Sequence, residues 1–340
     1  MAWNLVGHTW AANILTKHIQ SGNVKHAYLF CGLDGIGRRS LALRFAQALT
    51  CPNTRETAEP CLSCSSCQRI ARMQHPDLFV ISVPENRKEI SIDQVRALQH
   101  DLSLAPYEAP CRIGLLLDFQ NASDEAQNSM LKTLEEPTSR VVLLVTASRP
   151  EDLLPTIASR CEVVLLRPAG SEEISNALEK ETGIGKADAE KLARLSNGCY
   201  GQALAMQQDP EKVTKINSLI DGMLEAMTLP LRDRFAYAEE LAPRKSSTRE
   251  NLQGVFRVWI SFWRDALIIA TQAKTPVIHN DYDSILHSLA EEIPLPEIQA
   301  QLARLEDGFD QLDKNANARL LTEVMVMGFP QRRKSPNPPR

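Results

Sequence analysis

The stretch YLFCGLDGIGRRSLALRFAQAL, residues 28–49, constrains the fold of this chain more than any other. A short apolar run leads into Gly32, Gly35 and Gly37, and a helical pattern follows. A glycine turn between a strand and a helix presents backbone N–H groups and a helix N-terminus to phosphates. The stretch therefore predicts an α/β core built around a phosphate-cradling loop.

The residues after the glycines depart from the phosphate-loop motif. A working loop continues with Lys, which reaches the β and γ phosphates, and then with Ser or Thr, which binds Mg²⁺. Here Arg38 and Arg39 stand at these positions. Arg38 keeps a positive charge on a bulkier planar group, whereas Arg39 cannot coordinate a cation. Two interpretations stay open, namely weak or residual nucleotide binding and a glycine turn without a ligand.

A second departure follows the apolar run RIGLLLD at 112–118. It places Asp118 at the end of a predicted strand, where a carboxylate could support Mg²⁺. A hydrolytic site of this type continues with a Glu that polarises the attacking water, but Phe119 follows here, and a phenyl ring cannot accept a proton. Together with Arg38 and Arg39, this predicts that the chain has no autonomous ATPase activity.

The 340 residues are enough for two or three domains. Within 1–168, short apolar runs alternate with helical patterns, which predicts a parallel sheet with helices on both faces. The strands are expected at 27–31, 77–82, 112–118 and 141–147. From 169 the pattern is helical, and it predicts a small unit at 169–207 and an all-helical domain at 208–329. The basic, proline-rich segment 330–340 is expected to be disordered.

Four of the eight cysteines cluster as C-x9-C-x2-C-x2-C, at Cys51, Cys61, Cys64 and Cys67. No apolar run approaches the roughly 20 residues of a membrane span, and the N-terminus lacks a signal-peptide pattern, so we expect a cytoplasmic protein without membrane contact. In that reducing setting four clustered thiols predict a structural Zn²⁺ site. An iron–sulfur cluster and free reduced cysteines are the alternatives. His75 is expected to face solvent rather than to bind the metal.

Several motifs occur in a recognisable order along the chain: GH at 7–8, HAYLF at 26–30, the loop, SMLKTLEEP at 129–137 and SRC at 159–161. They resemble the AAA+ subunits of the bacterial replicative clamp loader. NANARLL at 315–321 resembles the C-terminal collar of that family, so the resemblance covers nearly the whole chain. It implies an AAA+ core at 1–168 with an inserted zinc module at 51–67, a helical lid at 169–207 and an oligomerising collar at 208–329.

Within this family, the altered loop resembles the delta-prime branch. The gamma/tau motor branch keeps Lys-Thr in the loop and Asp-Glu after the strand. The resemblance implies that Arg160 acts in trans, as an arginine finger for a neighbour's ATP, and that Thr146 occupies the position of a γ-phosphate sensor. From the residues alone, an ordinary surface or salt-bridged arginine is the favoured interpretation of Arg160, and Thr146 could be only a strand-terminal hydroxyl. Gly201 stands where motor subunits carry a nucleotide-sensing arginine.

The implied partners are gamma/tau motor subunits, which hold the ATP, and a delta subunit. The sliding clamp and primed DNA would be reached through the complex. One alternative is a divergent gamma/tau-like ATPase in which Arg38 replaces Lys, and it predicts turnover by the isolated chain. Another is a zinc-containing nucleic-acid-binding module, which predicts tight DNA binding by the monomer. The formal net charge of −4 argues against a large non-specific nucleic-acid surface.

Overall fold

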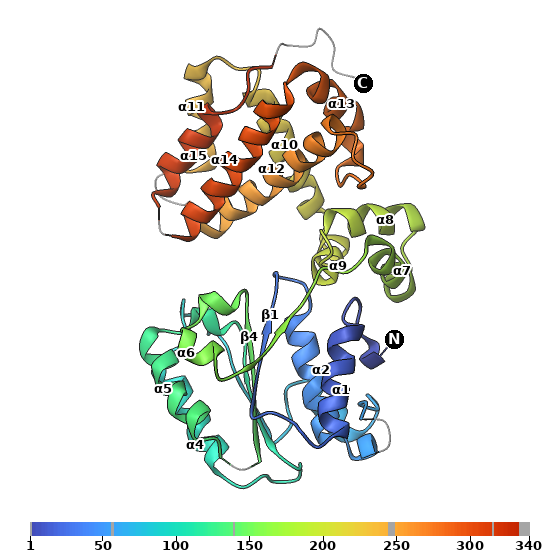
Figure 1. Cartoon of the computed structure of the whole chain (residues 1–340), viewed down its shortest axis with the longest axis vertical. Coiled ribbons are helices and arrows are strands. Elements are labelled where there is room, and N and C mark those ends of the chain that lie inside the picture. The colour runs from blue at the N-terminus through green and yellow to red at the C-terminus, as the bar shows by residue number, and fades with distance from the viewer. Residues whose placement is uncertain (1, 56–57, 139, 244–248, 315, 333–340) are drawn as a thin grey trace. The chain divides into compact units, whose positions relative to one another are not determined.

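A computed structural model of the chain describes residues 2–55, 58–138, 140–243, 249–314 and 316–332 (Figure 1). The chain forms two compact units, one up to Ala205 and the other from Met206 onward. None of the described helices combines the length and the apolar character that a bilayer crossing requires. The predicted disorder of 330–340 concerns mainly 333–340, which lie outside the described residues.

The first unit is built on a sheet of five parallel strands in the order β2-β3-β4-β1-β5. The bounds are β1 Ala27–Cys31, β2 Leu78–Ile81, β3 Arg112–Leu116, β4 Val141–Ala147 and β5 Glu162–Leu165. Every residue of β1, β3 and β4 is buried, as expected for strands covered on both faces. The predicted α/β core with a parallel sheet is confirmed.

Side chains of β1 alternate between two apolar clusters, one on each face of the sheet. Tyr28 and Phe30 pack with residues of α1 (Thr9–Gln20) and α2 (Arg38–Thr50). Leu29 and Cys31 pack with residues of α4 (Ile92–Ser103), α5 (Asp124–Glu135) and α6 (Pro155–Ala158). Helix α1 is absent from the sequence prediction, although three of its residues are fully buried on one face: Ala11, Ala12 and Leu15.

The strand order determines where a ligand site can form. The connection from β1 leads to β2 at one edge of the sheet, whereas the connection from β4 leads to β5 at the other edge. Adjacent strands whose connections diverge in this way open a crevice beyond their carboxyl ends. The glycine loop follows β1, Thr146 lies at the end of β4, and Asp118 follows β3. The glycine loop, Thr146 and Asp118 therefore all lie at the carboxyl ends of the strands, next to this crevice.

Three helices follow the sheet: α7 (Ser171–Thr182), α8 (Lys186–Leu195) and α9 (Tyr200–Gln208). The second unit is entirely helical in its described part. Its helices are α10 Glu211–Ala226, α11 Leu231–Leu241, α12 Arg249–Ala270, α13 Asp283–Glu292, α14 Leu295–Asp313 and α15 Ala318–Met327. Trp259 and Trp263 of α12 are fully buried in its core. The predicted helical character after 169 is confirmed, and the three-part division into core, lid and collar stays a prediction.

Candidate functional site

The glycine loop has the backbone that its sequence predicts. Gly35 and Gly37 have φ angles of 77° and 112°, in the left-handed region that favours glycine, and Gly37 is the N-cap of α2. A Cβ atom on Gly35 would lie 2.9 Å from the backbone nitrogen of Gln202. Glycine at position 35 is therefore required both by the turn and by the close approach of α9.

Arg38 turns back into this loop instead of reaching outward. Its Nη1 donates to the carbonyl of Gly32 at 2.8 Å and to Ser148 Oγ at 3.0 Å. Its Nη2 donates to Asp34 Oδ1 at 2.7 Å and to Asp118 Oδ1 at 2.9 Å. The Arg38 side chain is only 9% exposed. The guanidinium thus fills its own loop, and two carboxylates balance its charge.

Asp118 and Thr146, both predicted for a nucleotide site, bind to protein groups here. Asp118 has left-handed backbone angles, φ 49° and ψ 52°, and its N–H donates to Thr146 Oγ1 at 2.7 Å. The Thr146 hydroxyl therefore fixes the position of Asp118, whose carboxylate pairs with Arg38. Phe119 is fully buried in the core, so this position offers no proton acceptor beside Asp118.

Arg39 lies apart from the ion pairs of the loop. It is exposed, and its Nη2 donates to Met73 Sδ at 3.3 Å. The two neighbouring arginines therefore have different roles in the structure. Arg38 is a buried part of the loop, and Arg39 is a surface side chain at the start of α2.

Protein atoms also join the loop to the helices that follow the sheet. Gly201 N donates to the carbonyl of Gly35, and Gln202 Nε2 donates to the carbonyl of Asp34, both at 2.8 Å. A cavity of about 1320 Å³ lies beside this contact and is lined by both Arg38 and Arg39. Its volume is sufficient for a nucleotide. The space for a ligand is therefore retained, while the loop that would hold the phosphates contains Arg38.

Arg160 lies in the turn after α6, and its partners are on its own chain. Its Nη2 lies 2.7 Å from Glu135 Oε1, and its Nη1 donates to the carbonyl of Thr156 at 2.9 Å. The side chain is 35% exposed. Among the described residues, those that line the cavity beside the loop do not include Arg160. Arg160 is therefore both salt-bridged and accessible, and it lies away from the nucleotide-sized cavity of its own chain.

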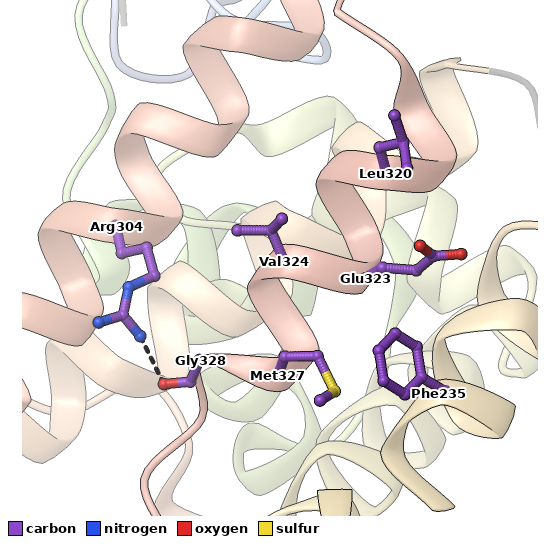
Figure 2. A pocket seen from close by; sticks show the side chains of 7 residues that line it. All are labelled: Phe235, Arg304, Leu320, Glu323, Val324, Met327 and Gly328. Atoms are coloured by element: carbon purple, nitrogen blue, oxygen red, sulfur yellow. Dashed lines mark hydrogen bonds between the residues drawn. The ribbon is translucent and has the colours of Figure 1, made fainter. Parts of the chain in front are cut away.

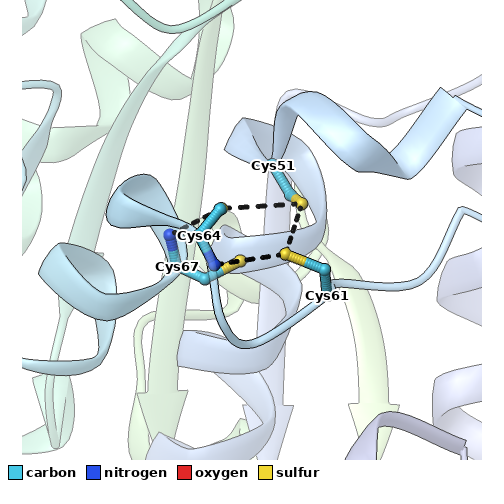
Figure 3. Close-up of side chains that lie close together, drawn as sticks. All are labelled: Cys51, Cys61, Cys64 and Cys67. Atoms are coloured by element: carbon cyan, nitrogen blue, oxygen red, sulfur yellow. Dashed lines mark hydrogen bonds between the residues drawn. The ribbon is translucent and has the colours of Figure 1, made fainter.

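The four clustered cysteines converge at the other end of α2 (Figure 3). Cys51 is the C-cap of α2, and Cys64 is the N-cap of α3 (Ser65–Ala71), which contains Cys67. The four sulfur atoms lie within 4.8 Å of one another, with Cys51 to Cys61 at 3.6 Å and Cys51 to Cys64 at 3.9 Å. Zn–S bonds of about 2.3 Å in a tetrahedron give sulfur–sulfur distances of about 3.8 Å. The four thiols thus fit a tetrahedral metal ion.

Backbone N–H groups point at two of these sulfurs. Cys64 N donates to Cys61 Sγ and Cys67 N donates to Cys64 Sγ, both at 3.4 Å. Backbone hydrogen bonds from Ser63 and Cys64 lower the pKa of the Cys61 thiol to about 5, whereas burial raises the pKa of Cys67. A bound metal would favour the thiolate at every ligand. Four sulfur donors with no open position suit a structural metal rather than a catalytic one.

The expectation that His75 faces solvent is wrong. The side chain is buried, its Nδ1 accepts a hydrogen bond from Asp77 N at 3.1 Å, and its Nε2 lies 3.0 Å from Glu108 Oε1. Burial lowers the pKa of His75. The loop that carries Glu108 covers the histidine, and Asp77 holds this loop through the N–H groups of Tyr107, Glu108 and Ala109.

The sequence interpretation missed the residues that engage the two key arginines. Asp34 stands four positions before Arg38, a spacing at which opposite charges often pair, so this signal was present. Ser148 and Glu135 contact their arginines only through tertiary structure. No local pattern in the sequence identifies those two contacts.

Comparison with known proteins finds similarity to subunits of bacterial DNA polymerase III. A family model described as "DNA polymerase III, delta subunit" matches residues 7–170. The delta-prime subunit of Bacillus subtilis DNA polymerase III is 26% identical over 320 residues, which cover 92% of this chain and 93% of the relative. The delta-prime subunit of Pseudomonas aeruginosa is 40% identical over 212 residues, which cover 60% of this chain and 64% of the relative.

Tau subunits of DNA polymerase III are also similar to this chain. The tau subunit of Escherichia coli DNA polymerase III is 31% identical over 208 residues, which cover 60% of this chain but only 32% of that subunit. Among solved structures, a gamma-subunit-related protein from Thermotoga maritima covers 94% of this chain and 99% of its own, at 18% identity and a TM-score of 0.41.

Proposed function

Because the chain belongs to the AAA+ clamp-loader family of bacterial DNA polymerase III, we propose that it is the delta-prime type of subunit, which does not hydrolyse ATP itself. The observation that carries this proposal is the position of Arg38. Its guanidinium donates to the carbonyl of Gly32 and pairs with Asp34 and Asp118 inside the loop. A motor subunit needs this space for phosphates and this carboxylate for its metal ion.

The alternative of a divergent gamma/tau-like ATPase requires Arg38 to act in place of Lys. Such a role would require the guanidinium to leave four own-chain acceptors and expose two carboxylates to the phosphates. It would also require a general base, and Phe119 supplies none. The self-filled loop therefore favours the non-motor function, in which the loop serves as a structural element without nucleotide.

The active contribution that we propose for this subunit is Arg160. It would stabilise the charge that develops on ATP held by a neighbouring gamma/tau subunit, an effect worth about 10³–10⁵ in rate for fingers in trans. Two observations support the assignment: the side chain is 35% exposed, and it lies outside the lining of its own cavity. Both are expected of an arginine that serves another chain.

The second unit would be the collar through which the subunits assemble. A cavity of about 550 Å³ lies on this unit and is lined by residues of α11, α14 and α15. Figure 2 shows the side chains that line it. Phe235, Leu320 and Val324 at this cavity are 49%, 58% and 58% exposed. Exposed apolar side chains that gather around one depression are typical of a protein interface. They support assembly through this unit with gamma/tau and delta subunits, within a complex that loads the sliding clamp onto primed DNA in the cytoplasm.

The cysteine cluster would hold a structural Zn²⁺ through Cys51, Cys61, Cys64 and Cys67. The zinc would crosslink the end of α2 to α3 and would supply no catalytic position, since four thiolates complete its coordination. The alternative of an independent nucleic-acid-binding module is less well supported. The net charge of −4 provides no general attraction for phosphates, and binding to DNA would be shared across the complex.

The test is the DNA-stimulated ATPase activity of a clamp loader reconstituted with motor and delta subunits. We expect Arg160→Ala to lower kcat by at least about 10²-fold, a conservative bound for loss of a finger in trans. Arg149→Ala is the matched control, because Arg149 is an exposed arginine in the same segment. The isolated chain should show no turnover. An unchanged rate with Arg160→Ala would remove the finger role, and turnover by the isolated chain would support the motor alternative.

A further inference from the structure

The two motifs LKTLEEP and SRC, far apart in the sequence, meet in one ion pair. Glu135 belongs to the last turn of α5, and Arg160 to the turn after α6. Glu135 Oε1 lies 2.7 Å from Arg160 Nη2, and the two side chains are 51% and 35% exposed. The pair lies at the surface, and the proposed function of Arg160 does not by itself explain Glu135.

Helix α5 also fixes the backbone that carries Arg160. The buried side chain of Gln127 accepts a hydrogen bond from Leu154 N at 3.0 Å. Leu153 and Ile157 are buried in the same apolar cluster as Leu134 of α5. The start and the middle of segment 153–160 are thus held against α5. The flexible arginine side chain is the part whose direction remains to be set, and Glu135 contacts its outer end.

An acidic residue at this position has a local cost. The carboxyl end of a helix carries a partial negative charge, which disfavours carboxylates in the last turn. Glu135 therefore contributes little to the stability of α5. Its contact with the guanidinium is the favourable interaction that this carboxylate makes in the structure.

We infer that Glu135 is a positioning residue for Arg160, which it holds in the direction needed to reach a phosphoryl group on the neighbouring subunit. This inference depends on the proposed function of Arg160. A guanidinium has five N–H donors. The contacts with Glu135 and with the carbonyl of Thr156 occupy one donor on each terminal nitrogen. The remaining donors are available to phosphate oxygens without breaking either contact.

The pair is suited to guide the arginine rather than to sequester it. Half-exposed ion pairs are weak, so Glu135 restrains the side chain without a large cost of release. Donors that are already oriented need no rearrangement when charge develops in the transition state. Loss of Glu135 should therefore slow the chemical step by a modest factor and leave the affinity for ATP unchanged.

The experiment uses the reconstituted loader with four variants of this chain: Glu135→Gln, Glu136→Gln, Arg160→Ala and the double variant Glu135→Gln/Arg160→Ala. We expect Glu135→Gln to lower kcat for ATP about two- to fivefold, the range for a half-exposed ion pair, with KM unchanged. Glu136→Gln removes the same charge from the adjacent exposed residue and should match the wild type. The double variant should equal Arg160→Ala alone.

The outcomes separate this inference from the proposed function. If Arg160→Ala has no effect, the finger role itself fails. If Arg160→Ala lowers kcat but Glu135→Gln leaves it unchanged or raises it, the positioning role is wrong while the finger role stands. A further loss in the double variant would mean that Glu135 acts by another route and would also overturn the inference. Equal melting temperatures of the four chains would show that folding does not contribute.

Discussion

Helix α2 has a ligand-type site at each end, and the two sites differ in what completes them. At the amino end, Arg38 fills the glycine loop and pairs with Asp34 and Asp118. At the carboxyl end, the sulfurs of Cys51, Cys61, Cys64 and Cys67 converge within 4.8 Å of one another. The first site has a cation supplied by the chain, whereas the second presents four donors to a common centre.

Under the proposed function, the difference shows how a side chain of the same chain can take the place of a ligand in such a loop. The loop keeps its glycines, its helix and a neighbouring carboxylate, but one side chain satisfies the groups that a metal–nucleotide complex would use. The four sulfurs surround a common point, and an added cation at that point would bind all of them at once. The proposed function therefore assigns a structural role to the loop, which its own chain completes, and a bound metal ion to the cluster, whose donors converge on a common point. Four predictions test this contrast, in order of expected effect.

The largest effect should come from removing the metal ion that we propose at the carboxyl end of α2. Cys64→Ser, or treatment with a strong chelator, should reduce the zinc content from one ion per chain to none. We expect the free energy of unfolding to fall by more than about 4 kcal/mol, as for loss of a structural metal. Zinc analysis and denaturant unfolding would measure both quantities. Cys111→Ser, outside the cluster, is the control. Unchanged stability after complete metal loss would contradict the structural role.

The next effect concerns the cation at the amino end. Arg38→Ala removes the partner of both carboxylates, and we expect a loss of about 1–2 kcal/mol, reduced from the value for a buried pair because Asp34 and Asp118 are 64% and 48% exposed. Arg39→Ala, one position away on the surface, should change stability by less than about 0.5 kcal/mol. Equal effects of the two substitutions in denaturant unfolding would show that Arg38 is not a structural part of the loop.

Two substitutions should turn the loop at the amino end of α2 back into a ligand-binding site. The double variant Arg38→Lys/Arg39→Thr restores the two residues that a phosphate loop uses, and the cavity of about 1320 Å³ leaves room for the ligand. We expect this variant to bind Mg²⁺–ADP. The ligand should stabilise it by about 1 kcal/mol when it is present at about fivefold above Kd. Thermal unfolding with and without ligand measures the shift, and the wild type should show none. A variant that remains unresponsive would mean that contacts other than Arg38 close the site.

The smallest effect should be a pH dependence confined to the carboxyl end, measured on metal-free reduced protein. We expect it to be small because the partly exposed Cys61 thiolate is screened by solvent. Hydrogen bonds from Ser63 and Cys64 lower the pKa of Cys61 from 9.0 to about 5 in the folded chain. The unfolded chain therefore binds the proton first as the pH falls, and the stability contributed by this thiolate decreases from pH 9 to pH 5. The melting temperature should follow this decrease. Cys61→Ser should remove it, and Arg38→Ala should retain it.

The sequence allowed prediction of features that depend on local pattern. Strands β1, β3 and β4 are continuous apolar runs because both of their faces are buried, so their positions follow directly from the residues. The loss of Lys and Ser/Thr after the loop was equally visible. The sequence could not show that Arg38 bends back, because that geometry depends on Asp118, eighty positions away, and on Ser148.

The sequence also does not predict burial that depends on loops far away in the chain. His75, followed by Pro76, was expected in solvent, but the loop with Glu108 covers it. Helix α1 was missed although its buried alanines and Leu15 follow a helical spacing. The sequence does not predict the partner of Arg160 either, because an ion pair between α5 and the turn after α6 leaves no local pattern in the sequence.

The contact between Gly35 and Gly201 limits which residues can stand at either position. Its hydrogen bond joins two backbone groups, and a Cβ on Gly201 would lie 2.8 Å from the Gly35 oxygen. A Cβ on Gly35 would in turn lie 2.9 Å from the backbone nitrogen of Gln202. The glycine loop and α9 can therefore keep this close approach only while both positions are glycine, and a side chain at either one would move the loop and the helix apart.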